Sequence, residues 1–300
     1  MALTVGMIGL GIMGTGMSSN ILKAGHAMVG HDIDPARVKI FTANGGRAMT
    51  SNAAVGHAAD IVFTSMPNAA ALIAVSEGAG SLTEADNAGL VVFETSTLPI
   101  AAKERARDAL AKVGIILLDC PLSGAGKQAE AGELSLMASG EMAGYDKATE
   151  IFDSFCKVHR YVGEFGTGMK LKMIINMLIS IHCAGFAEAI ALARKSGVDL
   201  DLMFDAVTAG AGNSRVVEYR GPLMINRKFA DPDWKTVNLP IQVKDNGVIA
   251  DWISSLHVPT PTFNSSTPYY EAGMSMGFLE EDPGAIVKVV ELISGIEVDD

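Results

Sequence analysis

The sequence predicts a chain of two parts: a doubly wound parallel β-sheet covered by helices, followed by a domain made only of helices. Through the first half, short apolar runs alternate with helical patterns, which is typical of parallel sheets built from βαβ units. The strand patterns end near Gly163, and a periodic apolar segment then runs from about Gly168 to Lys195, long enough for a helix that links two domains. We therefore expect an α/β domain in residues 1–163 and an all-α domain in residues 164–300.

Local signals place the elements of the first domain. A helix that begins near Ile12 is expected to end at Gly25, because glycine readily takes the left-handed conformation that closes helices. Asp34 before Pro35 indicates the start of another helix, with the carboxylate as N-cap and proline in the first turn. The expected strands are Thr4–Ile8, Ala27–Asp32, Ala48, Ile61–Ser65, Leu90–Glu94, Ile115–Asp119, Leu134–Ser139 and Arg160–Val162.

In the second domain, the linking helix is expected to end at Gly197. Shorter helices follow it, and glycine and proline predict where they break. The expected breaks are at Gly221-Pro222, Asp231-Pro232, the stretch from Pro259 to Pro268, and Pro283.

Composition narrows the class of protein. With 300 residues, 49% of them hydrophobic and 19% charged, the chain is globular. Its formal net charge of -11 disfavours binding to nucleic acid or to anionic membranes. The three cysteines show no CxxC spacing and the six histidines no metal-ligand spacing, which fits a reducing cytoplasm and no metal site. The start of the sequence lacks the basic region of a signal peptide, and polar residues interrupt the most apolar stretch, so we expect a cytoplasmic protein without a targeting segment or a membrane span.

A glycine-rich segment, GLGIMG at residues 9–14, lies between the first expected strand and the first expected helix, the context that a dinucleotide fingerprint requires. Gly9 permits the tight turn, Gly11 lets a pyrophosphate approach the backbone, and Gly14 allows the helix to pack on the strand. The helix N-terminus adds N–H donors and the positive end of its dipole. The expected cofactor-binding residues of this segment are Gly9, Leu10, Gly11, Ile12, Met13 and Gly14.

Asp32 ends the second expected strand, where a carboxylate accepts hydrogen bonds from the adenine ribose of a dinucleotide. Asp34 competes for this role, although its neighbour Pro35 suits it better as a helix cap. No arginine follows Asp32 directly, so a ribose 2′-phosphate would face an uncompensated carboxylate. We therefore expect NAD as the cofactor rather than NADP, with Arg37 as the nearby residue that favours NADP.

Two further segments suggest a site for an anionic substrate. Residues 119–126 read DCPLSGAG, a strand end followed by a glycine-rich turn whose N–H groups could converge on a carboxylate; a simple connecting loop is the alternative. Lys172, Asn176 and Ser180 recur every four residues on the long helix and form one polar stripe among apolar neighbours. Such a stripe lines a cleft, unless the lysine extends to solvent as helical lysines usually do. In a partly desolvated cleft, a lysine amine can exchange a proton with an alcohol near neutral pH.

Together these motifs resemble the β-hydroxyacid dehydrogenase family, 3-hydroxyisobutyrate dehydrogenase type, over nearly the whole chain. The resemblance rests on four motifs in order: GLGIMG at 9–14, DCPLSGAG at 119–126, GTGMKLKMIIN at 166–176, and the pair Lys244-Asp245. It implies a Rossmann-type domain, a long linking helix, and a helical domain that assembles a homodimer or homotetramer. It also implies metal-independent hydride transfer between NAD and a small 3-hydroxy carboxylic acid, in a cleft between the domains.

The resemblance also assigns roles to residues. Ser123 and the Gly124 amide would hold the substrate carboxylate, Lys172 would be the general acid and base, and Asn176 would orient substrate and lysine. The residues expected near the cofactor are Met66 and Pro67 in segment 64–67, Ser96 and Thr97 in segment 95–97, and Lys244.

Two positions depart from the family pattern. Ala125 stands where the family commonly has a second glycine after the serine, which adds a methyl group near the carboxylate loop. Ile175 stands where an asparagine often precedes Asn176, and this change leaves the asparagine one turn from Lys172 in place. We therefore expect catalysis to be retained and substrate choice to stay open, with residues 229–238 as the candidate lining.

Other functions fit parts of the pattern. A semialdehyde or glyoxylate reductase that uses NAD(P)H is an alternative within the same family. An imine reductase has a similar architecture, but the lysine at position 172 argues against it. A 6-phosphogluconate dehydrogenase would need a longer helical domain. A non-catalytic NAD-binding scaffold would be expected to lack Lys172, which is present.

Overall fold

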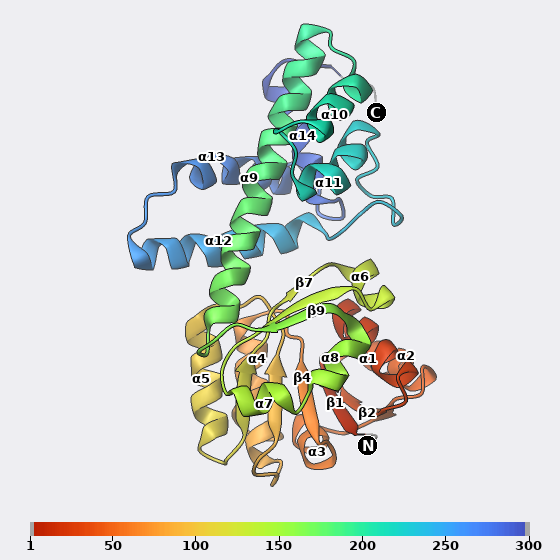
Figure 1. The fold of residues 1–300 in the computed structure, drawn as a ribbon, viewed down its shortest axis with the longest axis vertical. Helices are drawn as coiled ribbons and strands as arrows, with labels where there is room; N and C mark the ends of the chain where they lie inside the picture. Colours follow the sequence, from red (N-terminus) through yellow and green to blue (C-terminus); the bar gives the residue numbers. More distant parts are fainter. Residues whose placement is uncertain (1–2, 298–300) are drawn as a thin grey trace. The chain divides into compact units, whose positions relative to one another are not determined.

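The computed structural model describes residues 3–297 of the chain. The chain divides into two compact units, residues 1–172 and 173–300, and the boundary falls inside the long helix α9 (Thr167–Ser196). The first unit contains a parallel sheet with helices, and every regular element described in the second unit is a helix (Figure 1). This confirms the predicted fold class.

The main sheet of the first unit has six parallel strands in the order β3-β2-β1-β4-β5-β6. This is the strand order of dinucleotide-binding Rossmann sheets, in which ligands bind where the order reverses, beyond the carboxyl ends of the strands. Here the reversal lies between β1 and β4. The strands are β1 (Thr4–Ile8), β2 (Ala27–His31), β3 (Arg47–Ala48), β4 (Ile61–Thr64), β5 (Val91–Glu94) and β6 (Ile116–Asp119).

Continuous apolar runs form the central strands because both faces of the sheet are covered. Phe63 and Phe93 point to one face, where α1, α2 and α8 supply the core, while Val62 and Val92 point to the other, where α3, α4 and α5 supply it. The helices of the first unit are α1 (Ile12–Lys23), α2 (Pro35–Ala43), α3 (Asn52–Ala58), α4 (Ala69–Ser76), α5 (Ile100–Ala111), α6 (Gly126–Ala131), α7 (Met142–Asp146) and α8 (Thr149–Phe155), with a short 3-10 helix, η1 (Leu82–Glu84).

The expected helix signals of this unit are confirmed. Gly25, just beyond α1, has a φ of +92°. The Asp34 carboxylate accepts a hydrogen bond from the Ala36 N–H at the start of α2, and Pro35 occupies the first turn.

The sequence patterns missed part of a second, three-stranded sheet, β7-β8-β9. Its strand β7 (Leu122–Ser123) is too short to show any periodicity, and it pairs antiparallel with β8 (Leu134–Ala138). Strand β9 (Cys156–Tyr161) pairs parallel with β8 and begins four residues before the expected Arg160. The strand follows α8 directly, with no glycine or proline between Phe155 and Cys156 to mark where it begins.

The second unit continues α9 and packs five further helices around an apolar core. The core includes Phe186 and Ile190 of α9, and a buried ion pair between Arg220 and Asp282 lies beside it. Gly197 follows α9 with a φ of +75°, as expected. The helices are α10 (Leu200–Ala209), α11 (Arg215–Ile225), α12 (Leu239–Leu256), α13 (Pro261–Ser275) and α14 (Ile286–Ile293), with the 3-10 helix η2 (Pro283–Ala285).

One of the expected breaks in this unit is wrong, because Pro222 lies inside α11 and does not end it. The stretch from Pro259 to Pro268 does contain a break, between the end of α12 at Leu256 and the start of α13 at Pro261, although Pro268 itself lies inside α13. An internal proline removes one backbone hydrogen bond, and here burial of the surrounding helical face outweighs that loss. In α11 the residues on both sides, Gly221 and Leu223, are buried.

By length and composition, α9 is the one helix in the described part of the chain that is apolar enough to cross a membrane. A core helix of a soluble protein passes the same test. Three polar side chains of α9, those of Lys172, Asn176 and Ser180, are buried within the protein, as expected of a core helix with a polar stripe.

The aromatic cluster of the first unit gives a test of this packing. Phe152 is fully buried and lies 5.2 Å from the Phe93 ring and 6.0 Å from the Phe63 ring, both edge to face. Phe152→Ala is therefore expected to lower the free energy of unfolding by about 3–5 kcal/mol. Urea denaturation followed by circular dichroism measures this loss. The exposed Lys157→Ala is the control, with an expected change within about 0.5 kcal/mol; equal effects of the two changes would contradict the described core.

Candidate functional site

The glycine loop after β1 is tightly packed at its two ends and open in the middle. A side chain at Gly9, whose φ is +87°, would place its Cβ 2.3 Å from the Ser65 carbonyl oxygen, and one at Gly14 would place it 2.0 Å from the Gly9 carbonyl oxygen. A Cβ at Gly11 would meet no atom within 4 Å. The N–H groups of the first turn of α1 have no partner within the helix, so the open side of this loop suits a phosphate.

Asp32 is hydrogen-bonded to this loop. Its Oδ2 accepts from the Leu10 N–H at 2.6 Å, and its Oδ1 accepts from the Asp34 N–H at 2.8 Å. Asp32 and the glycine loop, both predicted to bind the dinucleotide, are therefore joined by a direct hydrogen bond. Each carboxylate oxygen retains capacity for a further hydrogen bond, as contact with a ribose hydroxyl would require.

The neighbouring acid and base have other partners. Asp34 caps α2 through Ala36, as the proline beside it predicted. Arg37 lies one turn later, with its Nε 3.9 Å from Asp34 Oδ2, and both side chains are well exposed. Ile33, between the two acids, is 96% exposed, so an apolar surface rather than a cation stands next to Asp32.

The two loops expected on the nicotinamide side lie together beyond β4 and β5. The Met66 N–H donates to Ser96 Oγ at 2.6 Å, and Thr95 Oγ1 donates to the Thr64 carbonyl oxygen at 2.8 Å. Pro67 and Thr97 are the next residues of the same two loops. The four residues of these loops that are expected near the cofactor therefore lie together in the structure.

The Ser123 loop lies next to the glycine loop. Gly124 has a φ of +131°, which favours glycine, and α6 begins two residues later. A Cβ at Gly126 would lie 2.8 Å from Ile12 Cγ2, and one at Gly16 would lie 2.8 Å from the Ala129 Cβ, so α1 and α6 pack backbone to backbone. The two expected anion-binding loops are thus neighbours in the first unit.

Asp119 does not face this loop as a ligand-binding acid. It is fully buried, and its Oδ1 lies 2.6 Å from Lys103 Nζ. Glu94, also fully buried, lies 2.6 Å from the same ammonium through its Oε2. Sequence reasoning missed this ion-pair cluster, because Lys103 stands on an otherwise ordinary amphipathic helix, α5, and shows no local sign of its partners.

The predicted polar stripe of α9 is buried. Lys172 is 8% exposed and Asn176 is 5% exposed. In the second unit, Asn176 Nδ2 donates to Asp245 Oδ2 at 2.9 Å, and Asp245 Oδ1 lies 2.9 Å from Lys244 Nζ. Asp245 therefore connects two of the expected site residues, Asn176 and Lys244.

A second polar stripe on α12 faces that of α9. Ser180 Oγ donates to Asn246 Oδ1 at 2.6 Å and accepts from Gln242 Nε2 at 2.9 Å. Gln242, Asp245 and Asn246 were not predicted as a group. Their spacing of three and four residues places them on one helix face, and this spacing is the signal that could have found them.

The expected site residues thus form two groups, each within one unit. The first unit joins the glycine loop with Asp32, with the Ser123 loop and with the Met66 loop, since a Cβ at Gly9 would lie 2.6 Å from Met66 Cε, and Met66 in turn contacts Ser96. The second unit joins Asn176 with Lys244 through Asp245. Lys172 is the last residue of the first unit and precedes Asn176 by one turn of α9.

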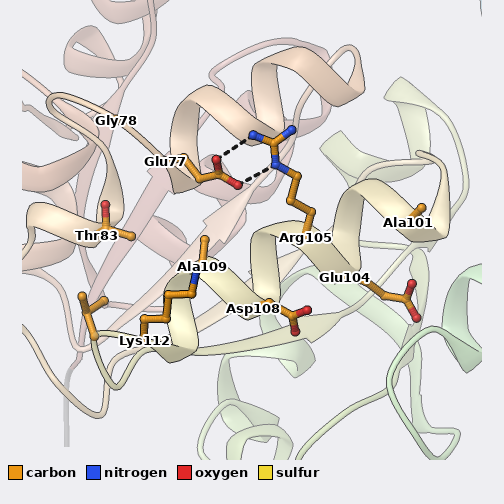
Figure 2. A pocket seen from close by; sticks show the side chains of 10 residues that line it. Glu77, Gly78, Thr83, Ala101, Glu104, Arg105, Asp108, Ala109 and Lys112 are labelled. Carbon is orange, nitrogen blue, oxygen red and sulfur yellow. Dashed lines mark hydrogen bonds and ion pairs between the residues drawn. The ribbon is translucent and has the colours of Figure 1, made fainter.

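A surface hollow along α5 shares none of these residues. Its lining includes Thr83 and Lys112, and its middle is crossed by a bidentate ion pair between Arg105 and Glu77, with N···O distances of 2.8 and 2.7 Å (Figure 2). The opposite charges of Arg105 and Glu77 neutralise each other, and both side chains are partly exposed. In residues 3–297, no group of three or more histidine, cysteine or acidic side chains could hold a metal ion.

The fold and the glycine loop are typical of a nicotinamide-dependent oxidoreductase. Comparison with known proteins supports this class. Residues 4–163 match the family model for the NAD binding domain of 6-phosphogluconate dehydrogenase. Residues 166–290 match the model for the NAD-binding region of NADP-dependent 3-hydroxyisobutyrate dehydrogenase. The chain belongs to the β-hydroxyacid dehydrogenase family, of the 3-hydroxyisobutyrate dehydrogenase type, which confirms the predicted family and its nicotinamide cofactor.

Two characterised relatives match over almost their full length. The chain is 32% identical over 298 residues to the 2-(hydroxymethyl)glutarate dehydrogenase of Eubacterium barkeri, covering 99% of this chain and 98% of that protein. It is 32% identical over 299 residues to the L-threonate dehydrogenase of Cupriavidus necator, with the same coverage of 99% and 98%. Among solved structures, the 3-hydroxyisobutyrate dehydrogenase from Salmonella typhimurium superposes with a TM-score of 0.83 at 30% identity, covering 95% of this chain and 99% of that one.

The cysteine thiols are poor nucleophiles in the folded protein. Burial raises the pKa of Cys120 well above its usual value, with the nearby Asp119 carboxylate adding to the effect. Burial also raises the pKa of Cys156 to about 12 and that of Cys183 above its usual value. Although Cys120 lies near the Ser123 loop, its thiol therefore stays protonated.

We accordingly expect almost no thiol of the native protein to react with Ellman's reagent at mildly alkaline pH, since the thiolate is the reactive form. All three cysteines should react once guanidinium chloride unfolds the chain. Absorbance of the released thiolate measures both values. A rapidly reacting thiol in the native protein that disappears in Cys120→Ser would contradict this expectation.

Proposed function

We propose that the protein oxidises the hydroxyl group of a small 3-hydroxy carboxylic acid with NAD, using Lys172 as general base and, in the reverse direction, as general acid. The observation that carries the proposal is the burial of Lys172 and Asn176 one turn apart on α9. Helical lysines usually extend the ammonium group to solvent, as the nearby Lys170 does. The burial of Lys172 departs from that pattern. Residues 1–163 would form the cofactor domain of a cytoplasmic homodimer or homotetramer, and residues 164–300 its helical substrate domain.

The glycine loop fits a dinucleotide. Gly11 leaves the backbone open where a pyrophosphate would approach, the start of α1 supplies N–H donors, and Asp32 has capacity left for a ribose hydroxyl. NAD is favoured over NADP because a ribose 2′-phosphate would meet the Asp32 carboxylate with no cation directly beside it. Arg37 lies beside Asp34, which offsets its positive charge. Leu10, Ile12 and Met13 complete the cofactor loop, with Met66, Pro67, Ser96, Thr97 and Lys244 on the nicotinamide side.

The chain's own residues then have defined tasks. Ser123 and the Gly124 amide bind the substrate carboxylate, and Asn176 holds the substrate with the amide group that Asp245 orients. The Lys172 amine takes the proton of the substrate hydroxyl, and the carbon that carried the hydroxyl becomes a carbonyl carbon as it loses hydride. Bound NAD supplies the hydride acceptor.

The direct test of this function is reduction of NAD by a panel of hydroxy acids, followed by the absorbance of reduced nicotinamide. The panel includes L-threonate, 2-(hydroxymethyl)glutarate and 3-hydroxyisobutyrate, which the names of the relatives supply. Turnover of at least one acid is expected. NAD binding without turnover of any acid, or of any semialdehyde or glyoxylate in the reverse direction, would favour a non-catalytic scaffold.

Lys172→Ala tests the catalytic assignment. Loss of a general base is expected to lower kcat by roughly 100- to 10,000-fold, while the Kd for NAD stays within about twofold, because the lysine side chain is not part of the glycine loop. Lys170→Ala, a neighbouring exposed lysine on the same helix, is the matched control and should leave kcat unchanged. Retained turnover in Lys172→Ala would refute the assignment.

Gly11→Ala tests the cofactor loop by a readout that needs no substrate. The φ of Gly11 is -66°, which alanine adopts freely, so thermal stability is expected to be unchanged. The added methyl group would occupy the space left for a pyrophosphate. We therefore expect the Kd for NAD to rise by about tenfold or more, which corresponds to a loss of about 1.4 kcal/mol of binding free energy. Isothermal titration calorimetry measures this. Gly185→Ala, at a glycine of α9 that also has open space around it, should bind NAD normally.

A further inference from the structure

Lys103 is buried at the carboxyl ends of β5 and β6, between Glu94 and Asp119. All three side chains are 0% exposed, and the ammonium lies 2.6 Å from one oxygen of each carboxylate. Burial alone would lower the pKa of Lys103, but the Asp119 and Glu94 charges outweigh it and raise that pKa above its usual value. The cluster therefore holds one positive and two negative charges, and each carboxylate has a second oxygen for other donors.

The second oxygen of Glu94 anchors a loop of the proposed site. Glu94 Oε1 accepts from the Ser96 N–H at 2.9 Å, and Ser96 Oγ in turn accepts from the Met66 N–H at 2.6 Å. Through Glu94, Lys103 therefore fixes the contact between the two loops of the nicotinamide side.

The second oxygen of Asp119 anchors the start of α9. Asp119 Oδ2 accepts from the Met169 N–H at 2.8 Å and from Ser139 Oγ at 3.1 Å. The same Ser139 Oγ accepts from the Gly168 N–H at 3.0 Å. Two first-turn donors of α9, which the helix itself cannot satisfy, thus have partners in this cluster, and Lys172 follows Met169 by three residues.

The chemistry of the cluster favours a positioning role over a purely structural one. Apolar side chains of similar volume often stabilise a core as well as a buried ion pair does, or better. The carboxylates add hydrogen-bond acceptors that point in fixed directions. Lys103 binds one oxygen of each carboxylate and so orients the other oxygen. Those two oxygens meet N–H groups of two separate segments, each of which carries residues of the proposed site.

From these contacts we infer that Lys103, acting through Glu94 and Asp119, is a positioning residue that sets the Ser96–Met66 loops and the first turn of the Lys172 helix relative to each other. The inference rests on the proposed function of Lys172. It gives the buried charges a role in the hydride-transfer geometry, since misplacement of reacting groups by as little as 1 Å is costly in rate.

The test uses a charge-neutral triple variant, Glu94→Gln, Lys103→Met and Asp119→Asn, which keeps carbonyl acceptors and side-chain volume but removes the ammonium that orients them. We expect kcat for the acid found in the panel to fall by about 10- to 100-fold, with the Kd for NAD within about threefold. Hydrogen–deuterium exchange should accelerate by about tenfold in segments 94–97 and 166–172 while segments of β1 and β2 are unchanged.

The matched control is a neutral variant of the surface ion pair between Arg105, on the same helix as Lys103, and Glu77, which follows α4: Glu77→Gln with Arg105→Met (Figure 2). It should change neither kcat nor exchange in the two segments. A second variant, Ser139→Ala, removes one hydroxyl and covers the case in which the triple variant does not fold. It should accelerate exchange in segment 166–172 alone and lower kcat by about threefold.

A folded triple variant with wild-type kcat would overturn the inference, as would unchanged exchange in both segments. If the triple variant does not fold, wild-type kcat and exchange in Ser139→Ala would overturn it instead. Failure of the proposed function is distinguishable, because full turnover in Lys172→Ala would refute the lysine assignment while the exchange measurement still reports on the cluster.

Discussion

The buried ammonium group of Lys103 and its two carboxylate partners lie at the carboxyl ends of β5 and β6, the last two strands in the order of the main sheet. Glu94 closes β5 and Asp119 closes β6, so two adjacent strands carry negative charge at the edge where α/β proteins bind their ligands. Without the cation between them, two carboxylates in an apolar core would be prohibitively costly. With it, each acid is free to orient one of the connections that leave the sheet. The loop after β5 and the beginning of α9 both depend on this arrangement.

Close packing supplies the complementary constraint on the other side of the sheet reversal. At Gly9 and Gly14 the backbone leaves no room for a side chain, whereas at Gly11 it leaves open space. The same glycine motif therefore contains two kinds of position, one required by the protein's own packing and one available to a ligand. Asp32 ties the loop to the end of β2, so that the first two strands and their connections behave as one support for the dinucleotide.

Patterns that are local in sequence predicted most of the fold. The short apolar runs of the strands, the cap at Asp34 and the left-handed glycine at Gly25 each depend on a few consecutive residues, and each appears in the structure. The two-residue strand β7 and the helical conformation at Pro222 and Pro268 were not predicted, because strand pairing and packing against distant segments determine them. The same distinction holds for the site. The glycine loop and the stripe on α9 are local motifs, whereas Lys103 and Asp245 gain their partners only when distant segments meet.

The contact between Gly16 of α1 and Ala129 of α6 has a consequence for how such an enzyme can change. No side chain larger than a methyl group separates the two helices there, and α1 and α6 begin next to the glycine loop and the Ser123 loop. The spacing of the loops is therefore set by the two smallest residues that proteins have. A larger residue at position 16 could be accommodated only by moving α6, since Ala129 has one carbon atom to give up. The two positions are therefore coupled, and the approach of α1 to α6 allows a larger side chain at neither of them alone.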